Sequence, residues 1–190
     1  PLQKMSTKKR LKMPENTFTN QPLFFTEPVI LTSNLHAESS FKPEVNYLFA
    51  AQTNSIPLTV SEFEQAASSY PIVFTGTDAI AVTGFTAEKN VFVDEEGQWD
   101  MRSYIPAYVR KYPFLFHESD DSDTFTLAIE KSNIEDDDSG APFFEEGKPT
   151  PVVAQSLEFC KNFQAAWKET HQFVSALVDL DLLIERRADL

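Results

Sequence analysis

Histidines, one cysteine and clustered carboxylates are the side chains of this 190-residue sequence that could do chemistry. None of the histidines has a second histidine or cysteine at metal-ligand spacing, so the sequence does not predict a zinc site. His117 precedes an acidic run, which would stabilise its protonated form. An enzyme of unrecognised type that uses His117 and the nearby carboxylates therefore stays open. The residues of this group are His36, His117, His171, Glu118, Asp120, Asp121 and Asp123.

Other signs of catalysis are lacking in the sequence. Cys160 lies among apolar residues, whereas a nucleophilic thiol needs a nearby positive charge, so we expect a buried and inert side chain. A single cysteine cannot form an intrachain disulfide, which fits a reducing compartment. No nucleophile-elbow, P-loop or dinucleotide-binding motif occurs. These observations favour a non-enzymatic protein without a cofactor.

An acidic loop resembles a calcium-binding loop in its spacing. Glu135, Asp137, Ser139, Gly140 and Glu146 occupy positions 1, 3, 5, 6 and 12 of an EF-hand-like pattern. The glutamate at position 1 is unusual, a proline follows the glycine, and the preceding residues are typical of a strand rather than a helix. Two interpretations follow, a calcium site and a solvated acidic loop.

A segment rich in aromatic and basic residues is the best candidate for ligand binding. Tyrosines and prolines alternate with two basic residues over 104–115. One interpretation is a wedge whose rings pack on a sheet, because aromatic residues are mainly core formers. The other is a cationic, aromatic-rimmed groove that holds a carboxylate or a peptide, since tyrosine and arginine are enriched at interfaces. The candidate binding residues are Trp99, Tyr104, Tyr108, Arg110, Lys111, Tyr112 and His117.

The elements that must position these residues predict an α+β fold. Short β-branched or aromatic runs separated by turns predict an antiparallel meander over 71–94 and 114–130, with Gly97 free to adopt a positive φ. Thr150 and Pro151 then start a long amphipathic helix that reaches about Leu180. Its apolar stripe should pack across the sheet, because strands followed by a long helix are typical of the α+β class.

Shorter elements are expected at four further places. Thr59 and Glu62 form a capping box, which predicts a helix over 58–70. The run 47–51 has strand propensity, and 23–31 is typical of an edge strand or an extended arm because Pro28 interrupts it. Residues 103–112 predict a short helix capped by Ser103.

Composition bounds the class of protein. The length predicts one domain over 23–190, preceded by a flexible basic arm over 1–22. The net charge is −13 although the first thirteen residues carry only basic charges, so the folded part should repel nucleic acid. No run of about 18 apolar residues predicts a membrane span. With no apolar signal region near the start, we expect a cytoplasmic protein, although export by a route other than Sec stays open.

Several runs together resemble the SapC family, which is named for a gene associated with bacterial surface layers. The longest and most specific is Tyr104–Leu115. The others, in chain order, are Tyr47–Ala51, Ile56–Leu58 with Glu62–Phe63, Tyr70–Phe74, and Asn90–Asp94 with Gly97 and Trp99. The resemblance extends over about residues 22–183. Family members usually continue past the long helix, so we expect this chain to be truncated at its C-terminus.

The resemblance implies a role in envelope or surface-layer biology. Family genes also tend to lie near flavin-dependent halogenases, oxygenases and TonB-dependent receptors, which implies an accessory protein that engages a protein or peptide partner. The family supplies no catalytic residues for positions of this chain. A structural surface-layer component is the remaining alternative.

Overall fold

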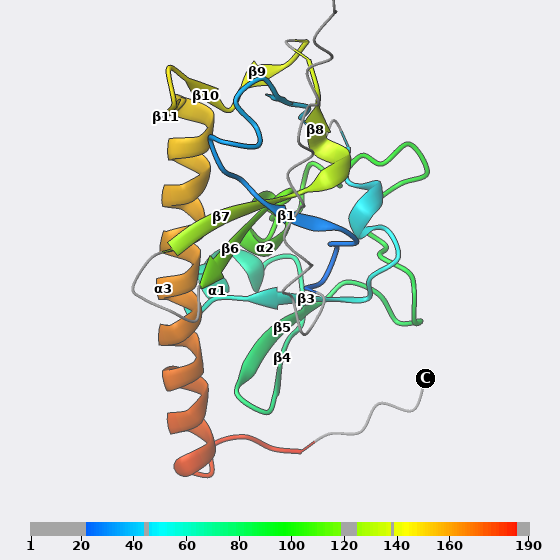
Figure 1. The fold of residues 1–190 in the computed structure, drawn as a ribbon. Coiled ribbons are helices and arrows are strands. Elements are labelled where there is room, and N and C mark those ends of the chain that lie inside the picture. The colour runs from blue at the N-terminus through cyan, green and yellow to red at the C-terminus, as the bar shows by residue number, and fades with distance from the viewer. Residues whose placement is uncertain (1–21, 44–45, 119–124, 138, 186–190) are drawn as a thin grey trace, which may run out of the picture.

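The computed structural model describes residues 22–43, 46–118, 125–137 and 139–185. The basic arm predicted over 1–22 lies outside these residues except for Pro22, as do Asp120, Asp121 and Asp123. The predicted α+β class is confirmed: small antiparallel sheets pack against one long C-terminal helix (Figure 1).

The long helix α3 runs from Pro151 to Asp179 along one side of the molecule (Figure 1). Thr150 is its N-cap and Pro151 its first residue, as predicted. Val153, Cys160 and Val174 are buried on the face turned to the sheets. On the same face Thr170 Oγ1 accepts a hydrogen bond from Val60 N at 2.8 Å. This bond fixes the helix against Val60, which lies just after the strand β3 (Ser55–Leu58).

One sheet has the order β1-β7-β6 and is antiparallel throughout. Its strands are β1 (Pro28–Ile30), β7 (Phe125–Glu130) and β6 (Phe114–Glu118). The predicted edge strand is confirmed, since β1 pairs with β7 alone. Leu127 and Ile129 of the central strand β7 are buried, and they pack with Phe114 and Phe143 beneath the first half of α3.

A second antiparallel sheet has the order β3-β5-β4. Its strands are β3 (Ser55–Leu58), β5 (Asp78–Val82) and β4 (Ile72–Thr75). Gly76, at φ +61°, makes the tight connection between β4 and β5 that the sequence predicts. Ile56 and Leu58 are fully buried and anchor a core that also contains Tyr70 and Trp99.

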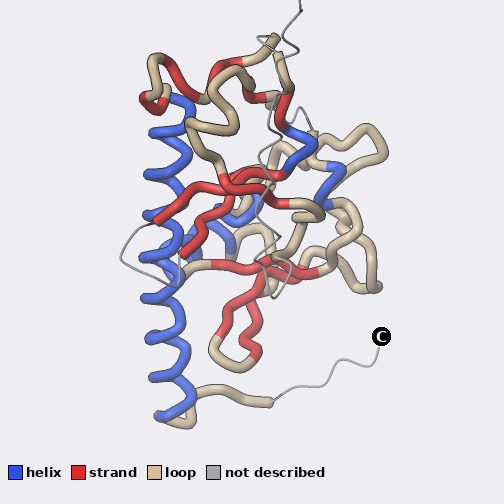
Figure 2. Tube along the Cα trace, viewed as in Figure 1, coloured by secondary structure: helices blue, strands red, loops and turns tan. Residues whose placement is uncertain are grey.

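The remaining elements are short, and much of the chain between them is loop (Figure 2). Two-residue strands form a three-stranded sheet β8-β2-β9 and a hairpin β10-β11. The strands predicted over 71–94 and 114–130 thus belong to two sheets, β3-β5-β4 and β1-β7-β6, rather than to one. These strands are β2 (Ser40–Phe41), β8 (Ile134–Glu135), β9 (Ala141–Pro142), β10 (Phe144–Glu145) and β11 (Lys148–Pro149). The short helices are η1 (Leu48–Ala50), η2 (Val60–Glu62), α1 (Phe63–Ala66), α2 (Ala107–Arg110) and η3 (Lys131–Asn133).

Three further predicted elements differ from those in the structure. The run 47–51 is the 3-10 helix η1 rather than a strand, since Tyr47 N donates to Gly97 O at 2.8 Å and closes a loop there. The helix predicted over 58–70 is only η2 and α1, because Leu58 belongs to the β3 ladder. Residues 90–94 contribute a single bridge, Val93 to Trp99, instead of a strand.

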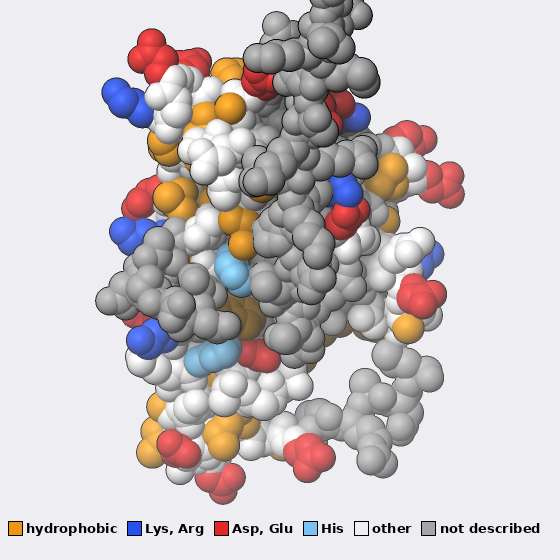
Figure 3. Space-filling model, in the orientation of Figure 1, with side chains coloured by type: hydrophobic (Ala, Val, Ile, Leu, Met, Phe, Trp, Pro, Cys, Tyr) orange, Lys and Arg blue, Asp and Glu red, His pale blue; other side chains and the backbone are white. Residues whose placement is uncertain are grey.

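The surface of the described part is acidic, and no helix in it is long and apolar enough to cross a membrane. Figure 3 shows carboxylates spread over the upper end, the edges and the lower end of one face, with fewer basic groups between them.

Gly97, at φ +78°, adopts the predicted positive φ, and a Cβ there would lie 2.8 Å from Leu48 Cγ.

Candidate functional site

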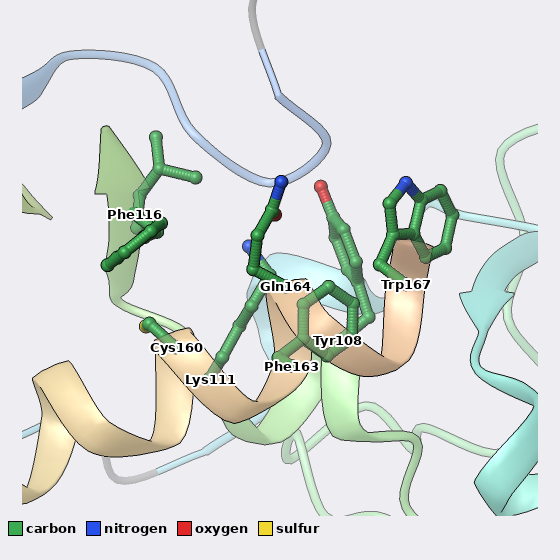
Figure 4. A pocket seen from close by; sticks show the side chains of 8 residues that line it. Tyr108, Lys111, Phe116, Cys160, Phe163, Gln164 and Trp167 are labelled. Carbon is green, nitrogen blue, oxygen red and sulfur yellow. The ribbon is translucent and has the colours of Figure 1, made fainter. Parts of the chain in front are cut away.

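A cavity of about 210 Å³ lies between α3, β6 and the segment that contains α2. We call it the Lys111 cavity. α3 contributes Cys160, Phe163, Gln164 and Trp167, and the other wall consists of Tyr108, Lys111, Leu115 and Phe116. Figure 4 shows Tyr108, Lys111, Gln164 and Trp167 with their ends turned to the same side. The cavity is larger than the engineered cavity of about 150 Å³ that binds benzene, so it has room for a six-membered ring.

Lys111 is the charged group of this cavity. It is 6% exposed, and burial lowers the pKa of its amine to about 8. The Nζ atom lies 4.2 Å from the ring centroid of Tyr108, 5.1 Å from that of Phe25 and 5.6 Å from that of Phe163. Among the residues that the structure describes, no carboxylate forms an ion pair with it. Within the described ranges, therefore, the aromatic faces stabilise this buried cation in part and no counter-charge completes it.

The neighbours of Lys111 are neutral at physiological pH. Burial raises the pKa of the Tyr108 phenol to about 12 and that of the Cys160 thiol to about 11. The predicted burial of Cys160 is confirmed, at 2% exposed. Phe163 stacks on Trp167 with ring centroids 5.9 Å apart, which completes an apolar wall. Gln164 is the exposed polar residue of the set.

Residues 22–27, which we call the strap, close one side of this site. Tyr108 Oη donates to Leu23 O at 3.4 Å, and the buried Phe25 contributes one of the rings around Lys111. Phe24 has φ +79°, a strained conformation for a bulky residue. Its ring is held by edge contacts with Phe49 at 5.2 Å and Tyr108 at 5.7 Å. Packing therefore maintains the strap against its backbone preference.

The buried carboxylate of Glu130 anchors the far end of the strap. It accepts hydrogen bonds from Thr26 N at 2.8 Å, Thr26 Oγ1 at 2.7 Å and Glu27 N at 2.9 Å. Hydrogen bonds to a charged acceptor contribute about 1.5–3 kcal/mol each. Glu130 at the end of β7 thus holds the C-terminal end of the strap, next to the buried Phe25.

Replacing Glu130 with Gln should loosen the strap. The amide keeps one acceptor oxygen and directs a donor at groups that are themselves donors, so amide hydrogen exchange at Phe25–Glu27 should speed up about tenfold or more. Glu27→Gln is the matched control, because Glu27 is exposed and its ion pair with Lys131 lies on the surface. Equal exchange in the two variants would show that Glu130 does not hold the strap.

The other predicted binding residues serve the fold in this structure. Trp99 is 4% exposed, and its Nε1 donates to Tyr70 Oη at 3.2 Å. The Tyr70 hydroxyl donates in turn to the backbone oxygen of Tyr104. Tyr112 stacks on Phe49 with ring centroids 4.0 Å apart. Of the aromatic and basic candidates, Tyr108 and Lys111 therefore line the cavity, and these residues do not.

Glu62 is the acceptor that organises the wall opposite α3. Its carboxylate is 5% exposed and accepts bonds from Thr59 N at 2.9 Å, Thr59 Oγ1 at 2.7 Å, Tyr104 Oη at 3.0 Å and Ala107 N at 2.6 Å. The predicted capping box is confirmed, and it also ties η2 to the start of α2. Arg110 Nη2 donates to Tyr104 Oη at 3.0 Å, so the arginine supports the same network. The N-cap of α2 is Pro106 rather than the expected Ser103.

Comparison with known proteins gives a match to one family profile. The sequence profile of the SapC family matches residues 31–190. The chain belongs to the SapC family. No curated protein and no solved structure matches it.

The two halves of the SapC segment 104–115 have different contacts in the structure. Its first half is held by Glu62, and its second half supplies Lys111 and Leu115 to the cavity. Tyr104, Arg110 and Tyr112 make contacts within the fold, and Tyr108 and Lys111 face the cavity. Binding of a carboxylate or a peptide by this segment stays a prediction.

His117 lies on β6, opposite Thr126 of β7, and is half-buried. It does not line the Lys111 cavity of this SapC chain. The acidic residues that follow it at 120, 121 and 123 lie outside the described part. An acid–base role for His117 therefore stays a prediction.

The calcium-like loop is built from short strands in this SapC chain. Glu135, in β8, pairs with Lys42 at 3.1 Å, and Asp137 Oδ1 accepts a hydrogen bond from Ser139 N at 2.9 Å. Glu146, at φ +48°, lies in the turn between β10 and β11. Within the described ranges no three acidic, histidine or cysteine side chains gather as a metal site would require. Calorimetric titration with calcium tests the prediction directly.

The cavity residues that the sequence interpretation missed lie on α3 and β6. Cys160, Phe163 and Trp167 belong to the stripe that was assigned to the core, and Gln164 is a polar residue beside that stripe. Phe116 directly follows the SapC segment. The available signal was weak, because three of these α3 residues belong to the apolar stripe and Gln164 is an exposed polar residue at its edge.

Proposed function

We propose that this SapC-family chain is a non-enzymatic binding protein that receives a carboxylate of a protein or peptide partner in the Lys111 cavity. The observation that carries the proposal is a buried ammonium group, beside a cavity, with no acidic partner among the described residues. A ligand carboxylate would supply the missing counter-charge and form a charge-assisted hydrogen bond.

The surroundings of Lys111 favour a carboxylate flanked by apolar groups. Phe163, Trp167 and Phe116 offer an apolar wall, and Gln164 at the surface offers an amide for a backbone group. The net charge of −13 repels a strongly acidic partner. A single carboxylate next to an aromatic or aliphatic side chain, such as the C-terminus of a chain, suits both conditions.

Peptide titration tests the proposal. The probe is acetyl-Leu-Phe with a free carboxylate, and its control is the same peptide as the C-terminal amide, with binding followed by calorimetry. The free acid should bind about tenfold or more tightly, because a charge-assisted bond contributes about 1.5–3 kcal/mol. Lys111→Met should abolish the preference and Lys161→Met, an exposed neighbour on α3, should keep it. Equal affinity of acid and amide for the natural chain would refute the proposal.

The affinity for the free acid should depend on pH. The amine has a pKa of about 8 in the free protein and must be charged to pair with a carboxylate. Binding should therefore be constant from pH 6 to 7 and weaken above about pH 8, by up to tenfold per pH unit. Calorimetry in buffers from pH 6 to 9.5 measures this profile, and the amide peptide should show no such decline. A free-acid affinity that stays level to pH 9.5 would exclude Lys111 as the pairing group.

Membership of the SapC family supports a proposal for the cellular setting. We propose an accessory role in envelope- or surface-layer-related or halogenase- and oxygenase-linked pathways, with a protein or peptide rather than nucleic acid as partner. The acidic composition supports this choice of partner, and the unpaired Cys160 supports a cytoplasmic location. An enzyme that uses His117 is the second candidate. An enzymatic activity that the natural chain has and the His117→Gln variant lacks would favour the enzyme over the binding protein.

A further inference from the structure

We propose that Lys111 also acts as a nucleophilic amine, which condenses reversibly with the carbonyl group of a small aromatic aldehyde that enters the Lys111 cavity. This activity goes beyond the proposed function, because it forms a covalent bond where that function needs only an ion pair. The inference rests on the same cavity and not on the carboxylate proposal.

The surroundings of the amine meet the first requirement, a supply of the neutral form. A lysine is activated as a nucleophile when an apolar pocket removes water from its ammonium form. Lys111 is 6% exposed, three aromatic rings surround its Nζ, and the described residues place no carboxylate in ion-pair contact with it. A carboxylate partner would have kept the amine protonated, so the missing counter-charge favours reactivity. The pKa of about 8 agrees with this reading of the contacts.

The cavity meets the second requirement, space for the carbonyl compound. Its volume of about 210 Å³ exceeds what a benzene-sized ring needs. Phe116, Phe163 and Trp167 offer faces and edges for an aromatic ring. Gln164 supplies an amide at the surface that could bind a polar substituent of the ligand. An aromatic aldehyde therefore fits the walls better than a charged or strongly hydrated carbonyl compound.

The chemistry is balanced without any further reactant. The lone pair of the neutral Nζ attacks the carbonyl carbon, a C–N bond forms, and the carbonyl electrons move to oxygen, which takes up a proton. The carbinolamine then loses water to give an imine, so that one amine and one aldehyde yield one imine and one water molecule with no change in oxidation state. The protonated imine is again a cation, and the rings of Tyr108, Phe25 and Phe163 stabilise it as they stabilise the ammonium group.

The neighbouring thiol should not compete. Burial raises the pKa of Cys160 to about 11, so this side chain stays a thiol at neutral pH. Tyr108 likewise remains a phenol, and its hydroxyl is directed to Leu23 O. The amine of Lys111 is thus the nucleophile that the cavity presents.

Borohydride trapping tests the inference on the full chain. The protein is incubated with benzaldehyde at pH 7.5 and reduced with sodium cyanoborohydride, and peptide mapping by mass spectrometry locates the benzyl groups. Lys111 should be labelled at least about tenfold faster than the exposed Lys161, because an amine in water has a pKa near 10.4 and is almost wholly protonated. The rate at Lys111 should level off above about pH 8, whereas the rate at an exposed amine keeps rising.

Two variants make the outcome decisive. Gln164→Trp fills the mouth of the cavity and should slow labelling at Lys111 about tenfold or more while leaving Lys161 unchanged. Lys161→Met should leave the labelling of Lys111 as it is. Equal rates at Lys111 and Lys161, or a rate at Lys111 that Gln164→Trp does not alter, would overturn the inference. Peptide-acid binding could still hold in that case, so the two ideas fail separately.

Discussion

Replacing Glu62 with Ala should destabilise the protein by about 3–5 kcal/mol, measured by urea unfolding at pH 7. The carboxylate accepts four hydrogen bonds and is 5% exposed, so its removal leaves buried donors on Thr59, Tyr104 and Ala107 without an acceptor. Domains of this size are stable by only about 5–15 kcal/mol, so the loss should remove a large part of the total.

Glu64→Ala is the matched control for this experiment. Glu64 is exposed, lies two residues further along the same turn and makes none of these bonds. Its replacement should change the free energy of unfolding by less than about 0.5 kcal/mol. A loss in Glu62→Ala no larger than in Glu64→Ala would mean that the four contacts do not stabilise the fold.

A double-mutant cycle with Tyr104→Phe assigns part of the effect. Tyr104 Oη donates to Glu62 and accepts from Arg110, so removing the hydroxyl should cost less once Glu62 is already Ala. The coupling should be about 0.5–3 kcal/mol. Additive losses would show that the tyrosine and the glutamate act independently.

The Glu62 network shows how far local sequence patterns determine this fold. The capping box was predictable, because a threonine followed three residues later by a glutamate satisfies local donors. The second use of the same carboxylate, for Tyr104 and Ala107, was not, because those partners lie more than forty residues away. The long helix and its start at Thr150 and Pro151 were also predictable from local sequence, because proline is favoured at the first helical position. The Thr150 hydroxyl, however, donates to Pro142 O at 2.7 Å and does not cap the helix.

The division of the strands into several sheets could not be obtained from local patterns. The pairing of β1 with β7 joins residues about a hundred positions apart, and alternation of apolar residues gives no information about which strands pair. The cavity illustrates the same limit. Lys111 and Tyr108 were candidates because the segment 104–115 combines aromatic and basic residues, but the opposite wall depends on how α3 packs on β6.

Arg110 and Lys111 are adjacent in sequence and differ completely in environment. Arg110 is exposed and donates to Ile105 O and Tyr104 Oη, whereas Lys111 is buried among rings. The difference follows from helix geometry, since consecutive side chains in a helical turn point about 100° apart. A lysine kept in the buried position is unfavourable for stability, and this suggests a role in function.

Lys111→Met should therefore stabilise the protein, by about 2 kcal/mol at pH 7 in urea unfolding, while abolishing selective binding of the free-acid peptide. Methionine has a similar length and suits the aromatic surroundings without needing a counter-charge. Cation–π contacts offset part of the burial penalty, but the lowered pKa shows that the fold still disfavours the charged amine.

The sign of the pH dependence makes this prediction specific. The folded amine loses its proton at a pKa of about 8 and the unfolded amine only near 10.4, so the natural chain gains stability as pH rises between these values. The advantage of Lys111→Met should thus be complete below pH 7 and shrink from pH 8 to 9. Lys161→Met should show no such change. If Lys111→Met is destabilised at pH 7, the rings satisfy the charge by themselves, and the cavity does not need a ligand carboxylate to complete it.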